Sequence, residues 1–378
     1  MAARALLRRG ARVVQDAGRW RLAGTALLLM LALFVAGWDW TRPLGGAGSQ
    51  REMPTADAER GLYDWRAATF APRVGQDQRV VMVVYDDQTL IATRKRSPLD
   101  RGLLARALRN LDAMGAKSIG IDILFDQPQD EDAQLIAALH GMRTPVWLGY
   151  ANIGDNREQI IFEQQQYLDR FIAQSRTDRV RPASIRLETD ADNVARSWPP
   201  PLAGQPPLLS LAMQPSPRFT DYRGAIRFRM PLAQADGAEE PVIPSLQIDL
   251  LADSAMAPAL APMVKGRHVL IGGDIVDIDQ FETPLSGRQA KSTMIGLEVH
   301  ATMLAQLLDG ALLPAIPGWA MWAAAALVVL AAGLTSLAEL RWFWLVPALV
   351  VQAGAIVGAP LWLQARGWDT KGLPAAGW

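Results

Sequence analysis

The central part of the chain alternates short apolar runs with amphipathic segments. Residues 80–85 form an apolar run rich in β-branched side chains, which is typical of a strand buried on both faces. Residues 100–114 then place leucine and alanine at helical spacing, and Gly115 follows where such a helix would end. Residues 118–125 form a second apolar run, interrupted by Asp122. This order predicts a strand–helix–strand crossover, which normally gives two parallel strands of one sheet.

The same alternation continues towards the C-terminal side. Residues 145–150 and 268–272 have the composition of further buried strands. Residues 130–140, 243–251 and 296–308 carry apolar side chains at helical spacing. The pattern therefore predicts an α/β fold with a mostly parallel sheet and flanking helices.

The stretch between the third and fourth predicted buried strands has a weaker pattern. Residues 160–177 are largely polar, and we expect them to form an exposed excursion that is not part of the core. Residues 184–189 and 225–230 alternate as strands do, while the proline-rich residues 199–207 predict a loop. The expected sheet domain therefore carries an irregular β portion in its middle.

An uncharged apolar run near the N-terminus, residues 22–38, just reaches the length of a membrane-spanning helix, about 17–25 residues. Six arginines and one aspartate precede it within residues 1–21, which predicts that this basic end stays in the cytoplasm. A cleaved signal peptide is the alternative. The run is long for a signal peptide and a poor cleavage site follows it, so an uncleaved anchor is favoured.

Two further apolar runs, residues 317–338 and 341–363, predict a membrane hairpin near the C-terminus. Most of the 13 tryptophans lie in or beside the apolar runs, and tryptophan favours the level of the lipid headgroups. Gly354 and Gly358 have the spacing that lets a second helix approach closely, although glycine is common in membrane helices for other reasons. Residues 364–378 form a C-terminal tail that could begin a further helix.

Composition and motifs exclude several classes of chemistry. The net charge of +0 gives no indication of a nucleic-acid partner. The chain has no cysteine, which excludes disulfides, thiol catalysis and cysteine-based zinc sites. It has no G-x-S-x-G elbow and no glycine-rich phosphate loop after a strand. We therefore expect no catalytic residues, and the sequence identifies no cofactor.

Four aspartates fall at or just after the carboxyl ends of predicted strands: Asp86, Asp87, Asp122 and Asp274. In open α/β sheets ligands bind outside these strand ends, and several carboxylates together suit a hard cation such as Ca²⁺ or Mg²⁺. The alternative is that these aspartates cap helices and close turns. They are the candidate ligand-binding residues, with the identity of any metal left open.

Two ordered blocks of sequence carry a family resemblance. The first contains YDDQTL, AMGAKSIG and IDILFDQP, and the second contains GRHVLIGGDIVDIDQFETPL followed by IGLEVHATMLAQLLDG. Together they resemble the CHASE domain of the second type, an extracytoplasmic sensory module of bacterial cyclases, histidine kinases and related receptors. The resemblance covers roughly residues 55–315.

This resemblance implies a sensory domain. With the three apolar runs and the basic N-terminal end, we expect an α/β domain in residues 39–316 that lies in the periplasm, held in a bacterial inner membrane by three transmembrane helices. The resemblance also implies a small-molecule ligand, which the sequence does not name. The family arrangement has three membrane helices after the sensor and then a cytoplasmic output module, whereas only two complete apolar runs follow here. We therefore expect either a fragment of a longer receptor or a sensor that signals through helix rearrangement or a partner.

The function expected from the sequence is a membrane-anchored extracytoplasmic sensor without enzyme activity. Such a sensor is expected to form a homo-oligomer or to act on a membrane or periplasmic protein. The alternative is a structural or assembly subunit of a cell-envelope complex, whose α/β domain docks a protein partner. An extracytoplasmic hydrolase is disfavoured because no nucleophile constellation is visible.

Overall fold

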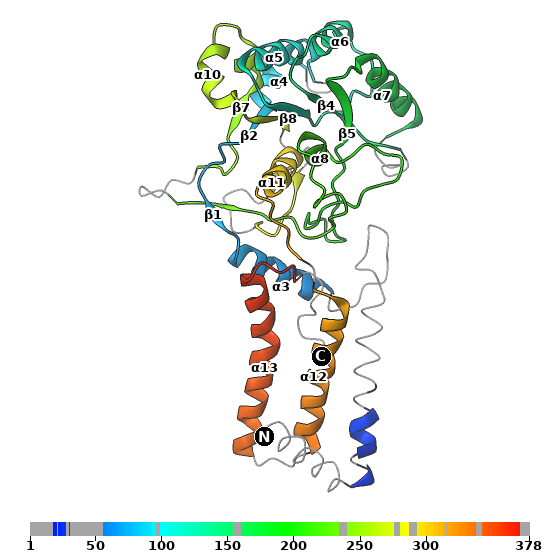
Figure 1. Cartoon of the computed structure of the whole chain (residues 1–378), viewed down its shortest axis with the longest axis vertical. Coiled ribbons are helices and arrows are strands. Elements are labelled where there is room, and N and C mark those ends of the chain that lie inside the picture. The colour runs from blue at the N-terminus through cyan, green and yellow to red at the C-terminus, as the bar shows by residue number, and fades with distance from the viewer. Residues whose placement is uncertain are drawn as a thin grey trace. The chain divides into compact units, whose positions relative to one another are not determined.

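The computed structural model describes residues 18–20, 22–27, 30, 56–95, 99–153, 160–233, 240–275, 280–286, 293–314, 316–337 and 342–370. The chain forms two compact units. Figure 1 shows the chain coloured by residue number, from blue at the N-terminus to red at the C-terminus. The sheet unit comprises Ala71–Thr189 and Asn193–Leu312. The helical unit comprises Met1–Phe70, Asp190–Asp192 and Leu313–Trp378.

The sheet unit is built on a six-stranded parallel sheet with the strand order β5-β4-β3-β8-β2-β7. Its strands are β2 (Val80–Asp86), β3 (Ser118–Ile121), β4 (Val146–Tyr150), β5 (Val180–Ser184), β7 (Ser245–Gln247) and β8 (His268–Asp274). The adjacent strands β2 and β8 are paired along their whole length. This sheet confirms the α/β fold with a mostly parallel sheet that the sequence predicts.

Helices cover both faces of this sheet, as Figure 1 shows. One face is covered by α5 (Arg101–Met114), α6 (Asp132–His140), α7 (Phe162–Ser175), α9 (Ile248–Ala252) and α10 (Ala257–Val264). The other face is covered by α8 (Leu209–Met213) and α11 (Gly296–Leu308). Alternate residues of β2 feed the two cores, with Val81 and Val83 on the first face and Val80 and Met82 on the second. Burial on both faces explains the continuous apolar run of this strand.

Helix α5 begins and ends where the sequence predicts. The Asp100 side chain caps its first turn by accepting a hydrogen bond from the Leu103 backbone N–H at 2.8 Å. Gly115 ends it in the left-handed conformation with φ 77°, which glycine adopts without a steric penalty. Between these caps Leu104, Leu108 and Leu111 are buried against the sheet.

Shorter elements complete the sheet unit. Helix α4 (Asp87–Thr93) follows β2 directly. The two-residue strands β1 (Arg73–Val74) and β6 (Met230–Pro231) pair in parallel, and β9 (Gln280–Phe281) pairs antiparallel with β10 (Met294–Ile295). These small pairs lie outside the main sheet.

The helical unit contains α3 (Ala56–Thr69), α12 (Gly318–Leu337) and α13 (Trp342–Ala365). Helices α12 and α13 lie side by side, joined by a hydrogen bond of 2.8 Å from the Gln352 amide to the Thr335 hydroxyl. At one end of this pair, the Asp369 backbone N–H donates to the Pro314 carbonyl at 3.0 Å. The residues that precede α12 therefore meet the residues that follow α13.

The three predicted membrane helices are borne out only in part. Among the described residues, one helix is long and apolar enough to cross a membrane, the part of α13 over Phe343–Ala365. Helix α12 contains a shorter apolar segment, Ala326–Thr335. Of the first apolar run only residues 22–27 and 30 are described, so the rest of that predicted helix lies outside the described residues, as do residues 1–17 and 371–378.

Four predictions for the middle of the chain are wrong, wholly or in part. Residues 160–177 contain the core helix α7, because Leu168, Phe171 and Ile172 recur on one buried face despite the neighbouring glutamines. The strand expected at 184–189 lies upstream, as β5, and the helix expected at 243–251 begins as strand β7. The expected β portion is mostly irregular chain, since most of residues 185–229 form neither strand nor helix.

Candidate ligand-binding site at the carboxyl edge of the sheet

The parallel sheet brings three of the four candidate aspartates to one edge. Asp86 and Asp274 are the last residues of the adjacent strands β2 and β8 and are paired in register. Asp122 follows β3 on the other side of β8, and its backbone N–H donates to the Ile271 carbonyl at 2.7 Å. Asp87 is the first residue of α4, directly after this edge.

Asp86 is a helix cap and a cross-strand tie. One oxygen of its carboxylate accepts hydrogen bonds from the Thr89 backbone N–H and the Thr89 hydroxyl, both at 2.8 Å. The other oxygen accepts from the Gln247 amide at 2.6 Å. Burial raises the pKa of Asp86, but the hydrogen bonds from Thr89 and Gln247 outweigh this and hold that pKa below its ordinary value. Both oxygens are therefore engaged, which favours the capping role for this aspartate.

Asp122 has the opposite electrostatic character. Burial raises the pKa of its carboxyl group to about 7, because desolvation disfavours the charged form. The residue as a whole is partly buried, and its carboxyl group is shielded from solvent. A carboxyl group that titrates near neutral pH at a strand end is a functional-site candidate.

A metal at this edge gains no support from the part of the chain that the structure describes. Within it, no three histidine, aspartate or glutamate side chains are grouped so that they could hold a metal ion. The acidic residues Asp277 and Asp279, which follow β8, lie outside the described residues.

A cavity of about 300 Å³ opens at the same edge and is here called the edge cavity. Its lining comes from the end of β2, the start of α5, the loop after β3 and the start of α7. The lining residues are Tyr85, Leu99, Asp100, Arg101, Leu104, Ile123, Leu124, Phe125, Asp126, Gln127, Gln129 and Gln164. The position agrees with the rule that ligands of open α/β sheets bind beyond the carboxyl ends of the strands.

The floor of the edge cavity is organised by Arg101, whose side chain is only 3% exposed. Its guanidinium forms an ion pair with Asp132 and donates to the Gln127 carbonyl at 2.8 Å. The same group lies 5.1 Å from the ring centre of Phe125 and 5.2 Å from that of Phe171. These contacts compensate the buried positive charge and hold the loop after β3 against α5 and α7.

Asp126 supplies a second carboxyl group with a raised pKa. Burial raises this pKa, and the positive charge of Arg101 opposes that effect only in part. One oxygen of Asp126 accepts a hydrogen bond from the Gln164 amide at 2.7 Å, which ties the loop after β3 to the first turn of α7. Arg101, Asp126 and Gln164 were not predicted from the sequence as site residues. The signal available for Asp126 was its place at the start of the polar stretch DQPQDED, after the apolar run 118–125.

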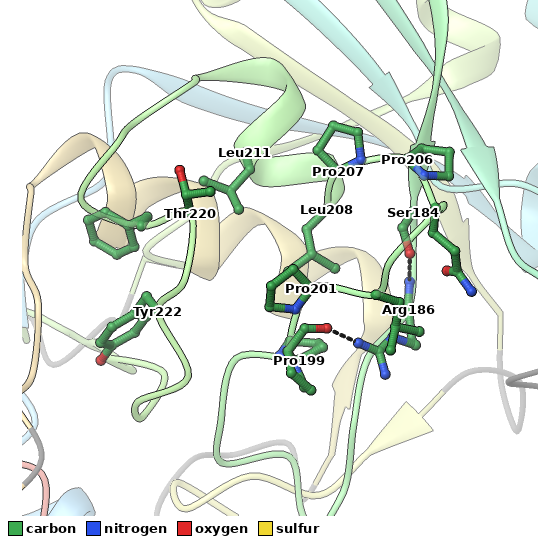
Figure 2. Close-up of a pocket in the computed structure, with 14 residues that line it drawn as sticks. Ser184, Arg186, Pro199, Pro201, Pro206, Pro207, Leu208, Leu211, Thr220 and Tyr222 are labelled. Carbon is green, nitrogen blue, oxygen red and sulfur yellow. Dashed lines mark hydrogen bonds between the residues drawn. The ribbon is translucent and has the colours of Figure 1, made fainter.

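A second, smaller cavity of about 110 Å³ lies beside the carboxyl end of β5, and is here called the proline cavity. Figure 2 shows Thr220 and Tyr222 on one side of it and Ser184 and Arg186 on the other. The Arg186 guanidinium bonds to Glu188 and to the Pro200 carbonyl. Five prolines contribute to its walls and restrict the backbone, so the cavity is built from stiff segments.

The parallel sheet and the edge cavity define an α/β domain with a cavity at the carboxyl edge of its sheet. A family model described as the CHASE2 domain matches residues 28–337. The chain has no significant match among curated proteins or among solved structures. Because the match spans most of its length, the chain belongs to the CHASE2 domain family. CHASE2 domains are extracytoplasmic and sensory, not catalytic.

Proposed function

We propose that this chain is a membrane-anchored extracytoplasmic sensor that binds a small molecule at the carboxyl edge of its sheet. The observation that carries the proposal is the edge cavity of about 300 Å³ in a chain of a sensory family. This volume suits a small metabolite. None of the four candidate aspartates predicted from the sequence lines this cavity, although Asp86, Asp122 and Asp274 lie at the same edge of the sheet.

The chemistry of the edge cavity favours a ligand that carries hydrogen-bond donors. Arg101 is already paired with Asp132, so the lining presents no uncompensated positive charge from this residue. Asp100 and Asp126 are the acidic residues of the lining, and Tyr85 and Phe125 form part of its wall but are themselves almost fully buried. Ammonium or hydroxyl groups would pair with such acceptors, and an aliphatic or ring portion would cover the apolar wall.

Aromatic residues at both ends of α13 support membrane anchoring. Trp344 is exposed near its first turn and Trp362 near its last turn. Trp362 lies 18 positions after Trp344, a rise of about 27 Å at 1.5 Å per residue, close to the thickness of the hydrocarbon core. With the basic residues 1–21 before the first apolar run, this arrangement is consistent with three membrane helices in a bacterial inner membrane and the sheet unit in the periplasm.

In this proposal, the signal passes through a movement of the helices of the helical unit and not through a chemical reaction. A ligand that changes the packing of β2, β8 or α11 changes the position of the segments that enter and leave the sheet unit. These segments lead into the helical unit, where a second copy or a membrane or periplasmic partner would read the change. We propose no enzyme activity for residues 1–378.

Ligand-dependent stabilisation tests the sensor proposal. The full chain in nanodiscs is screened for a rise in melting temperature with amines, amino acids, polyols, Ca²⁺ and Mg²⁺. A ligand of the edge cavity should raise the melting temperature of the wild type and lose this effect in the Asp126→Asn variant. The matched control is Asp130→Asn, an exposed aspartate of the same loop. A ligand that stabilises wild type and Asp126→Asn equally would place its site elsewhere.

Reporter fusions test the topology. Fusions at Gln50 and at Trp378 should both be active only with a reporter that functions outside the cytoplasm, because three membrane helices separate Trp378 from the cytoplasmic N-terminus. A cytoplasmic signal from the Gln50 fusion would overturn the proposed location of the sheet unit.

A structural subunit that docks a protein partner is the second candidate. It is favoured by two adjacent apolar side chains at the start of α7, Ile161 and Phe162, which are 60% and 61% exposed. Exposed neighbouring apolar residues are typical of protein contacts. Crosslinking from position 162 in intact membranes distinguishes the two candidates, since a pure sensor pocket predicts no protein adduct at this position.

A further inference from the structure

Helix α3 carries an exposed apolar stripe. Ala58, Leu62 and Trp65 are exposed and recur at the spacing of one helical face, and Leu62 and Trp65 are 40% and 47% exposed. Phe70, directly after the helix, is also 40% exposed. These side chains belong to a helix that otherwise carries five charged residues: Asp57, Glu59, Arg60, Asp64 and Arg66. The helix is therefore amphipathic, with its apolar stripe open to the surroundings.

A neighbouring side of α3 is fixed to the end of α13. Arg66 is buried, and its guanidinium donates to the Thr370 carbonyl at 3.5 Å. Thr370 is itself fully buried and lies five residues beyond Ala365, the last residue of the apolar span of α13. This contact within the helical unit places α3 at the level where that span ends.

Other residues at the same end have the character of a membrane interface. Trp319, in the first turn of α12, is 75% exposed. Trp362, in the last turn of α13, is 58% exposed and lies under the Arg366 guanidinium at 5.0 Å from its ring centre. Tryptophan and arginine at helix ends mark the headgroup level of a bilayer. The stripe of α3 thus lies at an end of the helical unit where Trp319, Trp362 and Arg366 are typical of a membrane interface.

We propose that α3 is an interfacial helix that lies on the outer surface of the bilayer, with Leu62 and Trp65 inserted among the lipid headgroups and Arg66 anchored to the end of α13. The partner is a phospholipid surface. An amphipathic helix in this position buries its apolar face about 5–10 Å into the boundary between headgroups and acyl chains. The inference rests on the proposed membrane anchoring and adds a second, peripheral contact with lipid.

The location gives this helix a role in the sensor. The chain passes from α3 at Thr69 into the sheet unit at Ala71, so α3 is the covalent entry to that unit. A change in lipid packing that lifts or sinks the stripe would act on this entry directly.

The chain contains no cysteine, so a single spin label can be placed without other changes. The variants are Leu62→Cys in the stripe, Asp57→Cys as the matched control, and Leu349→Cys as a depth reference in α13. Asp57 lies on the same helix away from the stripe, and its side chain is 88% exposed. The full chain is reconstituted in vesicles of phosphatidylethanolamine and phosphatidylglycerol, and label accessibility to oxygen and to a water-soluble nickel chelate is measured.

The expected result is a label at position 62 about 5–10 Å below the phosphate level, a label at 349 deep in the bilayer and a label at 57 in water. A label at 62 in water, with the label at 349 in lipid, would overturn the interfacial helix and leave the membrane anchor intact. Labels at both 62 and 349 in water would instead refute the anchor itself. Dipolar broadening at 62 that disappears when labelled chains are diluted with unlabelled ones would assign the stripe to a second copy, which also overturns the proposal.

Discussion

Trp198 and Gln306 are joined by a buried hydrogen bond of 2.9 Å from the indole N–H to the amide oxygen. The same oxygen accepts from the Arg227 backbone N–H at 3.0 Å. The amide nitrogen of Gln306 donates to the carbonyls of Ala225 and Ala311, at 3.2 and 2.9 Å. One side chain of α11 therefore fastens the irregular middle of the sheet unit to the last residues before the helical unit.

Replacing this glutamine should destabilise the protein. Gln306→Leu removes the acceptor of the Trp198 indole N–H and of the Arg227 backbone N–H, at a cost of about 1–3 kcal/mol for each group that stays unsatisfied. The melting temperature of the purified chain should fall by several degrees. Gln134→Leu, at an exposed position of α6, is the control and should change it little. Equal melting temperatures for both variants would mean that water replaces the lost hydrogen bonds.

Asp77 is the centre of an ion cluster beside the amino end of β2. Its carboxylate accepts from the Arg79 guanidinium at 2.8 Å and from that of Arg229 at 3.1 Å, and Arg79 also pairs with Asp309 at the end of α11. Burial raises the pKa of Asp77, but the hydrogen bonds from Arg79 and the charges of Arg79 and Arg229 hold that pKa at about 2. The cluster thus links the start of β2 to the end of α11 through charged groups.

The depressed pKa of Asp77 predicts a stability change at acidic pH. Its contribution is fully present above the ordinary value of 3.8 and is lost as the pH falls from about 4 towards 2. Asp77→Asn should cost about 2 kcal/mol at neutral pH and remove this part of the acid-induced loss. Melting temperatures at pH 7, 4 and 2.5, taken as differences from wild type, measure both effects. The exposed Asp57→Asn variant should show neither.

The raised pKa of Asp122 predicts a loss of stability as the pH rises, the reverse of the dependence expected for Asp77. Its folded-state pKa of about 7 lies above its ordinary value, so the folded protein loses stability as the pH rises from about 4 to 7 and changes no further above that. Asp122→Asn should therefore be more stable than wild type at pH 8 by about 2 kcal/mol, less than the full shift implies because the residue is only partly buried. At pH 4 the two proteins should melt within a degree or two of each other. Destabilisation at every pH would show that the carboxyl group holds the fold.

Gly354 and Gly358 offer a test of association in the membrane. A Cβ added at either glycine meets no heavy atom of the chain within 4 Å, so larger residues fit the monomer. Gly354→Leu combined with Gly358→Leu should weaken a helix contact between copies and shift the chain towards monomer in mild detergent. Ala355→Leu with Ala359→Leu, on a neighbouring exposed face, is the matched control. An oligomer that withstands the glycine substitutions would place its contact elsewhere.

The crossover at the centre of the sheet could be predicted from sequence because local signals agree there. An apolar run, an aspartate cap, a helical leucine pattern and Gly115 specify β2, α5 and the start of β3 without knowledge of the rest of the fold. Helix α11 is likewise found at the predicted residues, 296–308. In contrast, α7 was obscured by the consecutive residues Gln164, Gln165 and Gln166, although its buried positions keep helical spacing.

The candidate site was predictable only as a location. The aspartates at strand ends identify the carboxyl edge, because the end of a buried strand can be read from the sequence. The lining of the edge cavity depends instead on the loop after β3 meeting the first turns of α5 and α7, which are far apart in sequence. Arg101 forms an ion pair with Asp132, which lies 31 residues later in the sequence, and no local sequence pattern predicts such a pair.

The place of β8 between β2 and β3 constrains how this protein is made. Strand β8 (His268–Asp274) is the last of the six strands to be synthesised. Because it lies between β2 and β3, those two strands cannot be joined in one sheet before it is made. Pairing over such a separation in sequence is slow, and the waiting strand edges are exposed to other chains in the meantime. The two parts of the sheet, β5-β4-β3 and β2-β7, can therefore join only after almost the whole unit has been synthesised.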